Sequence, residues 1–226
     1  MTADTTRPVV IFGATSQARL AARYFETDSD RKPVAFTVDR AYLEADEFCG
    51  LPTVAFENVV ERYPPADHDL FVALGYTDMN RLRADKYNEA KAKGYRLPSY
   101  VSSHCTYLSE FEPGDNCLIL EDNTIQPGVR IGNNVTLWSG NHIGHDSTIA
   151  DHVFIASQVV VSGFVTVKSY CFLGVNATLR DDITIAEATL VGAGAVIMAD
   201  TEEAGVYLPP RATKIDKLSH ELEISG

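Results

Sequence analysis

The chain has 226 residues, 45% of them hydrophobic, and a formal net charge of −12 at pH 7. This acidity argues against nucleic-acid binding, which requires a clustered basic surface, and no apolar run is long enough to cross a membrane. The four cysteines follow neither a disulfide nor a metal-ligand spacing, so we expect a reduced, cytoplasmic protein without a metal site.

The first part of the chain alternates between short apolar runs and helical patterns. Residues 8–12, 34–38 and 70–74 read as buried strands, and the first is followed by a turn and a helical stretch. A further helix is expected over residues 79–93. This alternation predicts an α/β domain with a small, Rossmann-like parallel sheet of three strands, which we assign to residues 1–97.

Small and polar residues follow the carboxyl ends of these three strands. They are Gly13, Ala14 and Thr15 after the first strand, Asp39 and Arg40 after the second, and Gly75 after the third. Ligands of parallel sheets bind beyond the carboxyl ends of the strands, so we expect a pocket there. The dinucleotide fingerprint GxGxxG is absent, which disfavours a nicotinamide cofactor. Whether the first turn binds a ligand or only packs stays open.

The second half of the chain repeats with a period of six. Every sixth residue from Ile119 to Ile197 is isoleucine, leucine or valine, and the residue four places later is usually small or aliphatic. A six-residue period is typical of a solenoid in which each repeat is one short strand and a corner. Three strands would form one triangular coil around an aliphatic interior. We expect this solenoid over residues 98–200, followed by a C-terminal loop and tail over 201–226, since the period fails at Glu203.

The aliphatic stripe resembles that of the hexapeptide-repeat acyltransferases. This resemblance implies a left-handed parallel β-helix assembled as a homotrimer. The left hand comes from the resemblance alone, because ordinary crossover connections are right-handed. The same helix also carries zinc enzymes of carbonic-anhydrase type and non-catalytic scaffolds, so the function has to be argued from the site.

Acyl transfer from a thioester needs a general base, and histidine is the residue that serves near neutral pH. Within eleven residues of the repeat region lie His142, His145 and His152. The seven residues that begin at Ile143 resemble the catalytic segment of the family, which implies His145 as the base and Asp146 as the acid that raises its basicity. Zinc binding would require histidines separated by whole coils or by a short fixed spacing, and the chain has neither.

A small α/β domain ahead of hexapeptide repeats resembles the sialic acid O-acetyltransferase and bacillosamine N-acetyltransferase group, over residues 9–210. That group modifies sugars for surface glycans. The resemblance implies that the first turn and the acid after the second strand hold a nucleotide-linked amino sugar. The corresponding residues are Gly13, Ala14, Thr15, Asp39 and Arg40, together with Gly75 of the same crevice. Members of this group commonly have the motif G-x-G-G-H at this turn. Residues 13–17 of this chain keep its first glycine but lack the other two glycines and the histidine. The identity of the sugar and its carrier therefore stays open.

The same resemblance implies acetyl-CoA as co-substrate, bound along the edge of the coils. Gly163 would offer its backbone N–H to the thioester carbonyl, and Val175 and Ala193 would line the arm of this coenzyme A ester. Phe154 occupies a place where some relatives carry histidine.

The resemblance therefore implies a homotrimeric, acetyl-CoA-dependent N-acetyltransferase, which we expect to act by direct transfer in a ternary complex. The acceptor would lie between the first domain of one subunit and the prism of its neighbour. Two alternatives remain. One is a sugar O-acetyltransferase of sialic-acid type that uses the same base, and the other is a non-catalytic trimeric β-helix scaffold that has kept only the stripe.

Overall fold

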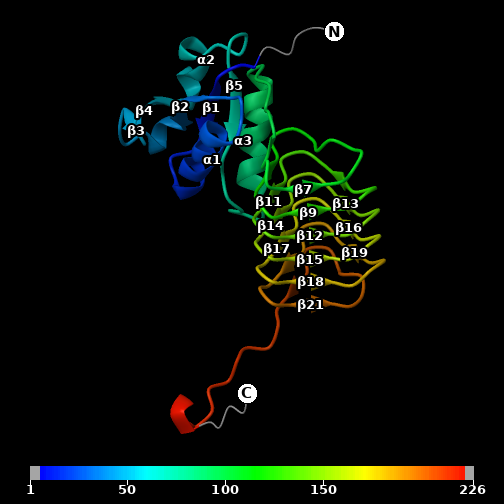
Figure 1. Ribbon diagram of the computed structural model, residues 1–226. Coiled ribbons are helices and arrows are strands. Elements are labelled where there is room, and N and C mark those ends of the chain that lie inside the picture. The colour runs from blue at the N-terminus through cyan, green and yellow to red at the C-terminus, as the bar shows by residue number, and fades with distance from the viewer. Residues whose placement is uncertain (1–5, 222–226) are drawn as a thin grey trace.

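A computed structural model describes residues 6–221, in which an α/β domain lies beside one end of a long β-solenoid (Figure 1). The chain leaves the far end of the solenoid as an extended tail that includes one 3₁₀ turn, η3 (Ser219–Glu221). Within residues 6–221, no helix is long and apolar enough to span a bilayer.

The α/β domain is built on a five-stranded sheet with the order β3-β4-β2-β1-β5. Its strands are β1 (Val9–Phe12), β2 (Pro33–Val38), β3 (Glu47–Phe48), β4 (Leu51–Ala55) and β5 (Asp69–Val72). All neighbours pair in parallel except β3 and β4, which form an antiparallel hairpin. The helices are α1 (Ser16–Thr27), α2 (Val59–Arg62) and α3 (Arg81–Ala92), with 3₁₀ turns η1 (Arg40–Tyr42) and η2 (Phe56–Asn58).

The predicted strands 8–12, 34–38 and 70–74 correspond to β1, β2 and β5, and the predicted helix 79–93 corresponds to α3. The expectation of only three strands is wrong, because β4 and β3 extend the sheet beyond β2. Strand β3 has only two residues, and Pro52 interrupts the apolar pattern of β4. Neither segment therefore carries a clear strand signal in the sequence.

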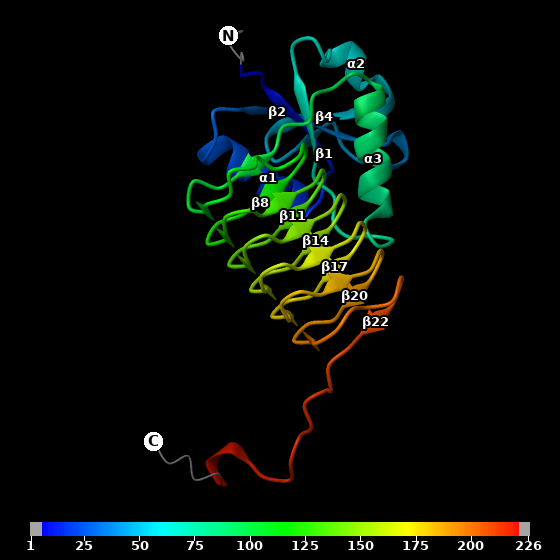
Figure 2. The ribbon, with the colours of Figure 1, turned by 90° about the vertical axis from the view of Figure 1, so that its right-hand side faces the viewer.

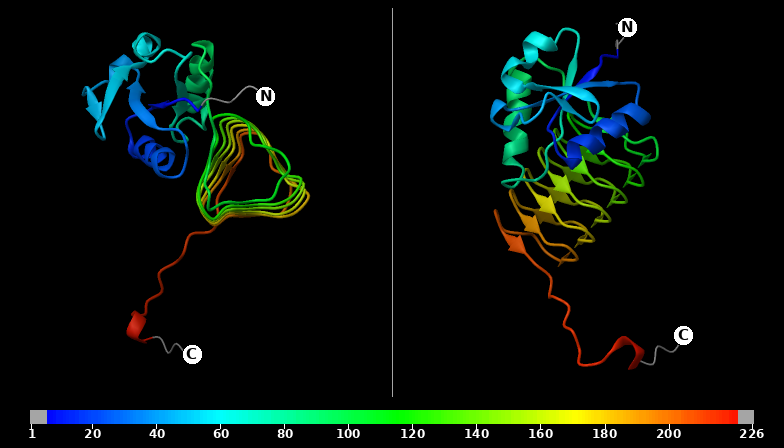
Figure 3. Two further views of the ribbon diagram at one scale, coloured as in Figure 1. Left: turned by 45° about the horizontal axis from the view of Figure 1, so that its top comes forward. Right: turned by 90° about the vertical axis from the view of Figure 1, so that its left-hand side faces the viewer.

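The solenoid winds around three parallel sheets and is triangular in cross-section (Figure 3). The first face contains β6 (Tyr100–Val101), β8 (Leu118–Ile119), β11 (Thr136–Leu137), β14 (Phe154–Ile155), β17 (Phe172–Leu173), β20 (Leu190–Val191) and β22 (Val206–Tyr207). The second face contains β7 (Thr106–Tyr107), β9 (Thr124–Ile125), β12 (His142–Ile143), β15 (Val160–Val161), β18 (Thr178–Leu179) and β21 (Val196–Ile197). The third face contains β10 (Arg130–Ile131), β13 (Thr148–Ile149), β16 (Thr166–Val167) and β19 (Thr184–Ile185).

Each coil of the solenoid uses 18 residues, or three hexapeptides, since Thr136 pairs with Phe154 and Phe154 with Phe172. The predicted aliphatic stripe forms the interior, and none of its fourteen residues from Ile119 to Ile197 is more than 6% exposed. Burial of this continuous core holds together repeats that could not fold singly. Strand β22 still joins the first face beyond residue 200, where we expected a loop.

We call the corner between the first and second faces the first corner, the next one the second corner, and the one that returns to the first face the third corner. The α/β domain lies against the first face, as Figure 2 shows for α3 beside β11 and β14. Leu118 and Leu120 from this part of the solenoid pack into the same apolar cluster as Phe25 of α1 and Phe71 of β5. The two parts of the chain therefore share a core.

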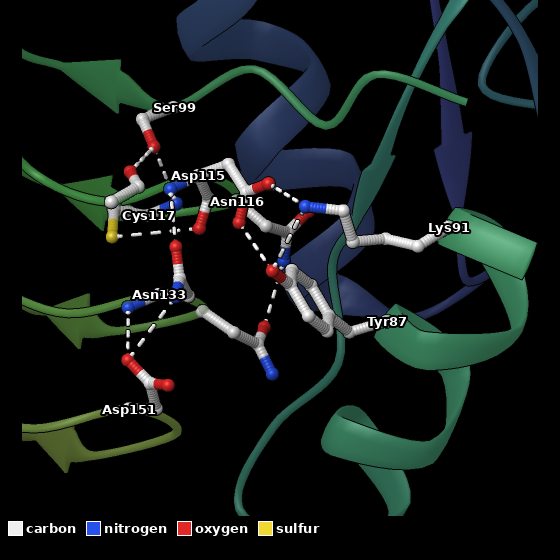
Figure 4. A network of polar contacts seen from close by, with 10 residues as sticks. Tyr87, Lys91, Ser99, Asp115, Asn116, Cys117, Asn133 and Asp151 are labelled. Carbon is white, nitrogen blue, oxygen red and sulfur yellow. Dashed lines mark hydrogen bonds and ion pairs between the residues drawn. The ribbon is translucent and has the colours of Figure 1, made fainter. Parts of the chain in front are cut away.

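Polar side chains of α3 and of the loop before it bind the third corner. Asn80 donates through Nδ2 to the carbonyls of Tyr170 and Cys171 at 3.2 and 3.0 Å. Further along α3, Tyr87 and Lys91 both contact the carboxylate of Asp115 (Figure 4). A ladder of corner residues continues below, where the backbone N–H of Asp115 donates to Asn133 Oδ1, and that of Asn133 to Asp151 Oδ1 (Figure 4).

Candidate functional site

The second corner carries a histidine paired with an acid. Asp146 has a φ of 57°, a left-handed conformation that turns its side chain back toward its neighbour. Its Oδ2 accepts a hydrogen bond from Nδ1 of His145 at 2.9 Å. An ionised carboxylate only accepts, so Nδ1 carries the proton and Nε2 keeps a lone pair. About half of each side chain is exposed, 51% for His145 and 55% for Asp146. The pair can therefore take a proton from a molecule at the surface.

Two glycines leave room for this pair. A Cβ at Gly128 would lie 2.5 Å from Oδ1 of Asp146, and one at Gly163 would lie 2.7 Å from Nε2 of His145. Both positions are one coil, or 18 residues, away from the side chain that they accommodate. Gly163 was predicted as a donor-site residue, and the structure brings it to His145. Gly128 was missed, although a glycine one coil before the acid is a signal that the six-residue period makes visible.

The preceding coil also supports the corner. Oε1 of Gln126 accepts a hydrogen bond from the backbone N–H of His145 at 2.8 Å, and Oε2 of Glu110 accepts one from the N–H of Gly128 at 3.0 Å. The ring of Phe164 lies edge-on to the imidazole, with the centroids 4.9 Å apart. The histidine is thus held by its own coil and by the coils before and after it.

A cavity of about 640 Å³ opens at the carboxyl ends of β1 and β2, as predicted. Four of the predicted substrate residues line it: Gly13, Ala14, Thr15 and Asp39. Oδ1 of Asp39 accepts a hydrogen bond from Nζ of Lys86 at 2.9 Å. Because five carboxylates and one ammonium line this space, we call it the acidic cavity.

The remaining two predicted substrate residues do not line the acidic cavity. The guanidinium of Arg40 bonds to the side-chain carbonyl of Asn58, and its backbone N–H donates to the carboxylate of Glu57. The carbonyl of Gly75 accepts a hydrogen bond from Nη1 of Arg83 at 3.0 Å. Both residues thus support elements around the cavity without facing it.

The residues predicted to bind the acyl donor do not all lie in one part of the solenoid. Val175 follows β17 and Ala193 follows β20, so both lie on the first corner, one coil apart, and Val175 is 44% exposed. Phe154 is only 3% exposed, because the rings of Tyr76 and Phe172 cover it. The structure therefore separates Phe154 from the solenoid corners, and it packs beneath the α/β domain.

The other histidines and the thiols do not form a second centre. His142 lies on the second face, and His152 is buried at the third corner, where Nδ1 bonds to Nδ2 of Asn134 at 2.9 Å. Burial raises the pKa of Cys117 and of Cys171 to about 12, so neither forms a thiolate near neutral pH. Within residues 6–221, no three histidine, cysteine or acidic side chains gather closely enough to hold a metal ion.

The acidic cavity and His145 of one chain lie on opposite sides of the prism. The α/β domain lies on the first face and contacts both corners beside it (Figure 3). His145 lies between β12 and β13, at the corner between the other two faces. One subunit alone thus does not join them.

Comparison with known proteins agrees with this architecture. Residues 129–163 match the model of the bacterial transferase hexapeptide family (six repeats), which confirms the predicted hexapeptide-repeat resemblance. The UDP-3-O-acylglucosamine N-acyltransferase of Herminiimonas arsenicoxydans is 30% identical over 88 residues, or 39% of this chain and 23% of that protein. The chain therefore spans about a quarter of the length of this relative.

Two solved structures share nearly the whole fold. The acetyltransferase domain of PglB from Neisseria gonorrhoeae has a TM-score of 0.79 at 22% identity, over 89% of this chain and 96% of that one. PerB from Caulobacter crescentus, solved with CoA and GDP-perosamine, has a TM-score of 0.77 at 22% identity, over 88% and 92%. An α/β domain followed by a left-handed parallel β-helix is confirmed as the fold class. Residues 129–163 thus carry the repeats of the bacterial transferase hexapeptide family.

Proposed function

We propose that this protein is an acetyl-CoA-dependent N-acetyltransferase that acts on the amine of a nucleotide-linked amino sugar. One observation carries the proposal. His145 stands at an exposed corner with Nδ1 bonded to Asp146 and with Nε2 free to accept a proton. A scaffold that had kept only the aliphatic stripe would not need this pair or the two glycines that accommodate it. The likeness to PerB, solved with CoA and GDP-perosamine, supports the choice of substrates.

In the proposed reaction, His145 removes a proton from the acceptor amine while the nitrogen adds to the thioester carbonyl. Asp146 stabilises the imidazolium that forms. The backbone N–H of Gly163 holds the carbonyl oxygen as it gains negative charge. The carbon–sulfur bond then breaks, and His145 returns the proton to the thiolate. An amide and a thiol result, without a covalent enzyme intermediate.

The acyl donor would lie along the second face, between the corner of Gly163 and the corner of Val175 and Ala193. This placement is supported by the small side chains at two of these positions and by the exposed apolar surface of the face. Val160 is 39% exposed and Val196 is 62% exposed. We leave Phe154 out of the donor site because its ring is covered.

We further propose a homotrimer in which the acidic cavity of one subunit faces the second corner of its neighbour. The separation of cavity and base within one chain supports this assembly, since neither half alone would be a complete site. Residues 1–97 would bind the acceptor through Gly13, Ala14, Thr15 and Asp39, with Arg40 and Gly75 in support. Residues 98–200 would bind the donor and hold the base, and residues 201–221 would extend the solenoid through β22 and form a tail. Residues 222–226 of the predicted C-terminal segment lie outside the described residues.

The cytoplasm is the compartment that fits these substrates. Four free cysteines, at least two of them buried, support a reducing environment.

The test is release of free thiol from acetyl-CoA in the presence of nucleotide-linked amino sugars, with wild type and His145→Ala compared. We expect release that depends on both substrates and falls about 10²- to 10⁴-fold in the variant. Mass spectrometry of the product, with and without hydroxylamine treatment, separates a stable amide from the labile ester of an O-acetyltransferase. No release with any acceptor, from folded protein, would favour the scaffold.

A further inference from the structure

The acidic cavity has an unusual charge for a site that takes a nucleotide. Its only lysine, Lys86, is already bonded to Asp39 and Glu89, at 2.9 and 3.0 Å. Two further carboxylates at the rim, those of Glu44 and Glu47, make no hydrogen bond or ion pair within residues 6–221. Free carboxylates at contact distance repel phosphate, so the cavity is unsuited to the diphosphate of a nucleotide.

The wall of the cavity contains an unsatisfied hydroxyl. Thr53 lines the cavity and is 7% exposed, yet its Oγ1 has no hydrogen-bond partner within the described part of the chain. Strand β4 places Thr53 next to Pro52, the residue that pairs with Glu47 of β3. The hydroxyl and the Glu47 carboxylate therefore come from neighbouring strands of one hairpin. A buried hydroxyl without a partner is rare in folded proteins and suggests a ligand that completes it.

Aromatic rings complete the cavity. Phe48 lines it and is held by an edge-on contact with Phe36, with the ring centroids 4.9 Å apart. Tyr42 lines it as well and is 72% exposed. Flat apolar side chains beside acceptor groups suit a planar ring that carries N–H donors.

A second cavity of about 560 Å³ adjoins the first and has the opposite charge. It is lined by Ser16, Gln17, Arg19, Leu20, Arg23 and Trp138. The two cavities meet along the turn that begins α1, since residues 13–15 line one and residues 16–17 line the other. The guanidinium groups of Arg19 and Arg23 can bind phosphate. Trp138, on the other side of this cavity, follows β11 of the solenoid. A nucleotide laid across the turn would thus place its base in the acidic cavity and its sugar toward the solenoid.

We propose that the acidic cavity is a nucleobase pocket that selects guanine over uracil and thymine, through the carboxylates of Glu44 and Glu47 and the hydroxyl of Thr53. This inference rests on the proposed function, because it names the carrier of the acceptor sugar. Guanine presents N1–H and the 2-amino group side by side, and one carboxylate can accept from both. Uracil and thymine flank a single N–H with two carbonyl oxygens, which carboxylates repel. Adenine and cytosine offer one amino group beside a ring nitrogen that only accepts.

The test is calorimetric titration of the full chain with GDP, UDP, dTDP and ADP, without acyl donor. We expect GDP to bind at least about tenfold more tightly than each of the others, because one bidentate contact to a base gives discrimination of this size. Equal or tighter binding of UDP or dTDP would overturn the inference. Binding of none of the four would overturn it as well.

Three variants test which side chains cause the preference for GDP. In Glu44→Gln/Glu47→Gln, the preference for GDP over UDP should fall to about twofold or less. The matched control is Asp67→Asn, an exposed acid of the same domain outside the cavity, which should keep the wild-type preference. Thr53→Val should weaken GDP binding several-fold without lowering the melting temperature, because the lost hydroxyl has no partner in the free protein. A Thr53→Val variant that melts earlier and binds GDP normally would show that the hydroxyl is structural.

The base-pocket inference and the proposed function can be contradicted by different results. Preferential binding of GDP, without thiol release from acetyl-CoA in the presence of any GDP-linked amino sugar, would support the base pocket and contradict the proposed acyl transfer. Thiol release with a UDP-linked amino sugar and weak binding of GDP would do the reverse.

Discussion

A methyl group at Gly128 would lie 2.5 Å from Oδ1 of Asp146, so the carboxylate that orients His145 occupies space that only a glycine leaves free. The φ of Gly128 is 78°, and Gly50 in the β3–β4 hairpin has nearly the same φ of 79° but nothing near its missing side chain. Alanine at Gly50 would strain the backbone alone, whereas alanine at Gly128 would also displace the carboxylate of Asp146. Comparison of the two variants therefore separates these effects.

We predict that Gly128→Ala lowers acyl transfer about 10- to 100-fold, because the displaced carboxylate no longer holds the imidazole in place. Gly50→Ala should keep its activity. Both variants should lose a similar amount of stability, about 1 kcal/mol, from the left-handed backbone. The rate of thiol release and chemical denaturation measure the two effects. Equal activity in the two variants would show that Gly128 is only a corner residue.

Arg83 is predicted to hold the α/β domain on the solenoid. Its side chain is 1% exposed, and it donates to the carbonyls of Gly75, Asn134 and His152 at 3.0, 3.3 and 3.1 Å. Burial lowers the pKa of its guanidinium to about 9. Arg83→Met would leave these carbonyls without their donor and should cost about 2–4 kcal/mol of unfolding free energy.

The control for Arg83 is Arg81→Met, at an exposed position of the same helix where the guanidinium lies over the ring of Tyr170. This change should cost about 1 kcal/mol or less. Denaturant titration compares the two variants, and equal losses would contradict the role of Arg83.

His152 should make the protein less stable in mild acid. Burial is the main cause that lowers the pKa of this imidazole below its ordinary 6.5. The folded protein therefore binds the proton less readily than the unfolded chain. The stability that His152 contributes is complete above pH 6.5 and is lost as the pH falls from there toward the lowered pKa. His152→Asn removes the titrating group, and asparagine tolerates the φ of 63° at this corner.

We therefore expect the melting temperature of wild type to fall more between pH 7.5 and pH 5.5 than that of His152→Asn. Parallel thermal melts at the two pH values measure the difference. Identical pH dependence in both proteins would show that His152 does not contribute.

The proposed shared site predicts complementation between two inactive variants. His145→Ala removes the base and Arg19→Glu/Arg23→Glu reverses the charge of the cavity beside the acidic one, so each should be inactive alone. In trimers assembled at random from equal amounts, about a quarter of the sites would combine an intact base with an intact acceptor cavity. Co-expressed variants should thus recover about a quarter of wild-type activity. Activity that stays at the level of the single variants would place both parts of the site in one subunit.

The solenoid could be predicted because its signal is local and repeats. Each stripe residue from Ile119 to Ile197 has the same neighbours one coil away, so a single pattern indicates the whole core. The same register puts His145 at a corner, two residues after Ile143. Its pairing with Asp146 was expected from the resemblance to the catalytic segment of the family. What the sequence did not reveal depends on long-range packing.

The contacts between the two domains illustrate this limit. Phe154 lies at an outward position of its strand, where Tyr76 from the α/β domain and Phe172 of the next coil cover it. Arg83 is a helix residue with no special pattern, and its partners on the solenoid are backbone carbonyls of residues 51 to 70 positions later in the chain. Strands β3 and β4 were missed because they are short or contain proline, and with them the wall of the acidic cavity that holds Thr53.

The most direct test of the account is the dependence of thiol release on His145. Wild type and His145→Ala would be mixed with acetyl-CoA and a panel of nucleotide-linked amino sugars, after both are shown to be folded to the same extent. The account predicts release that requires one of these sugars in wild type and falls about 10²- to 10⁴-fold in the variant. Equal rates in the two proteins would contradict the role of His145 as the general base.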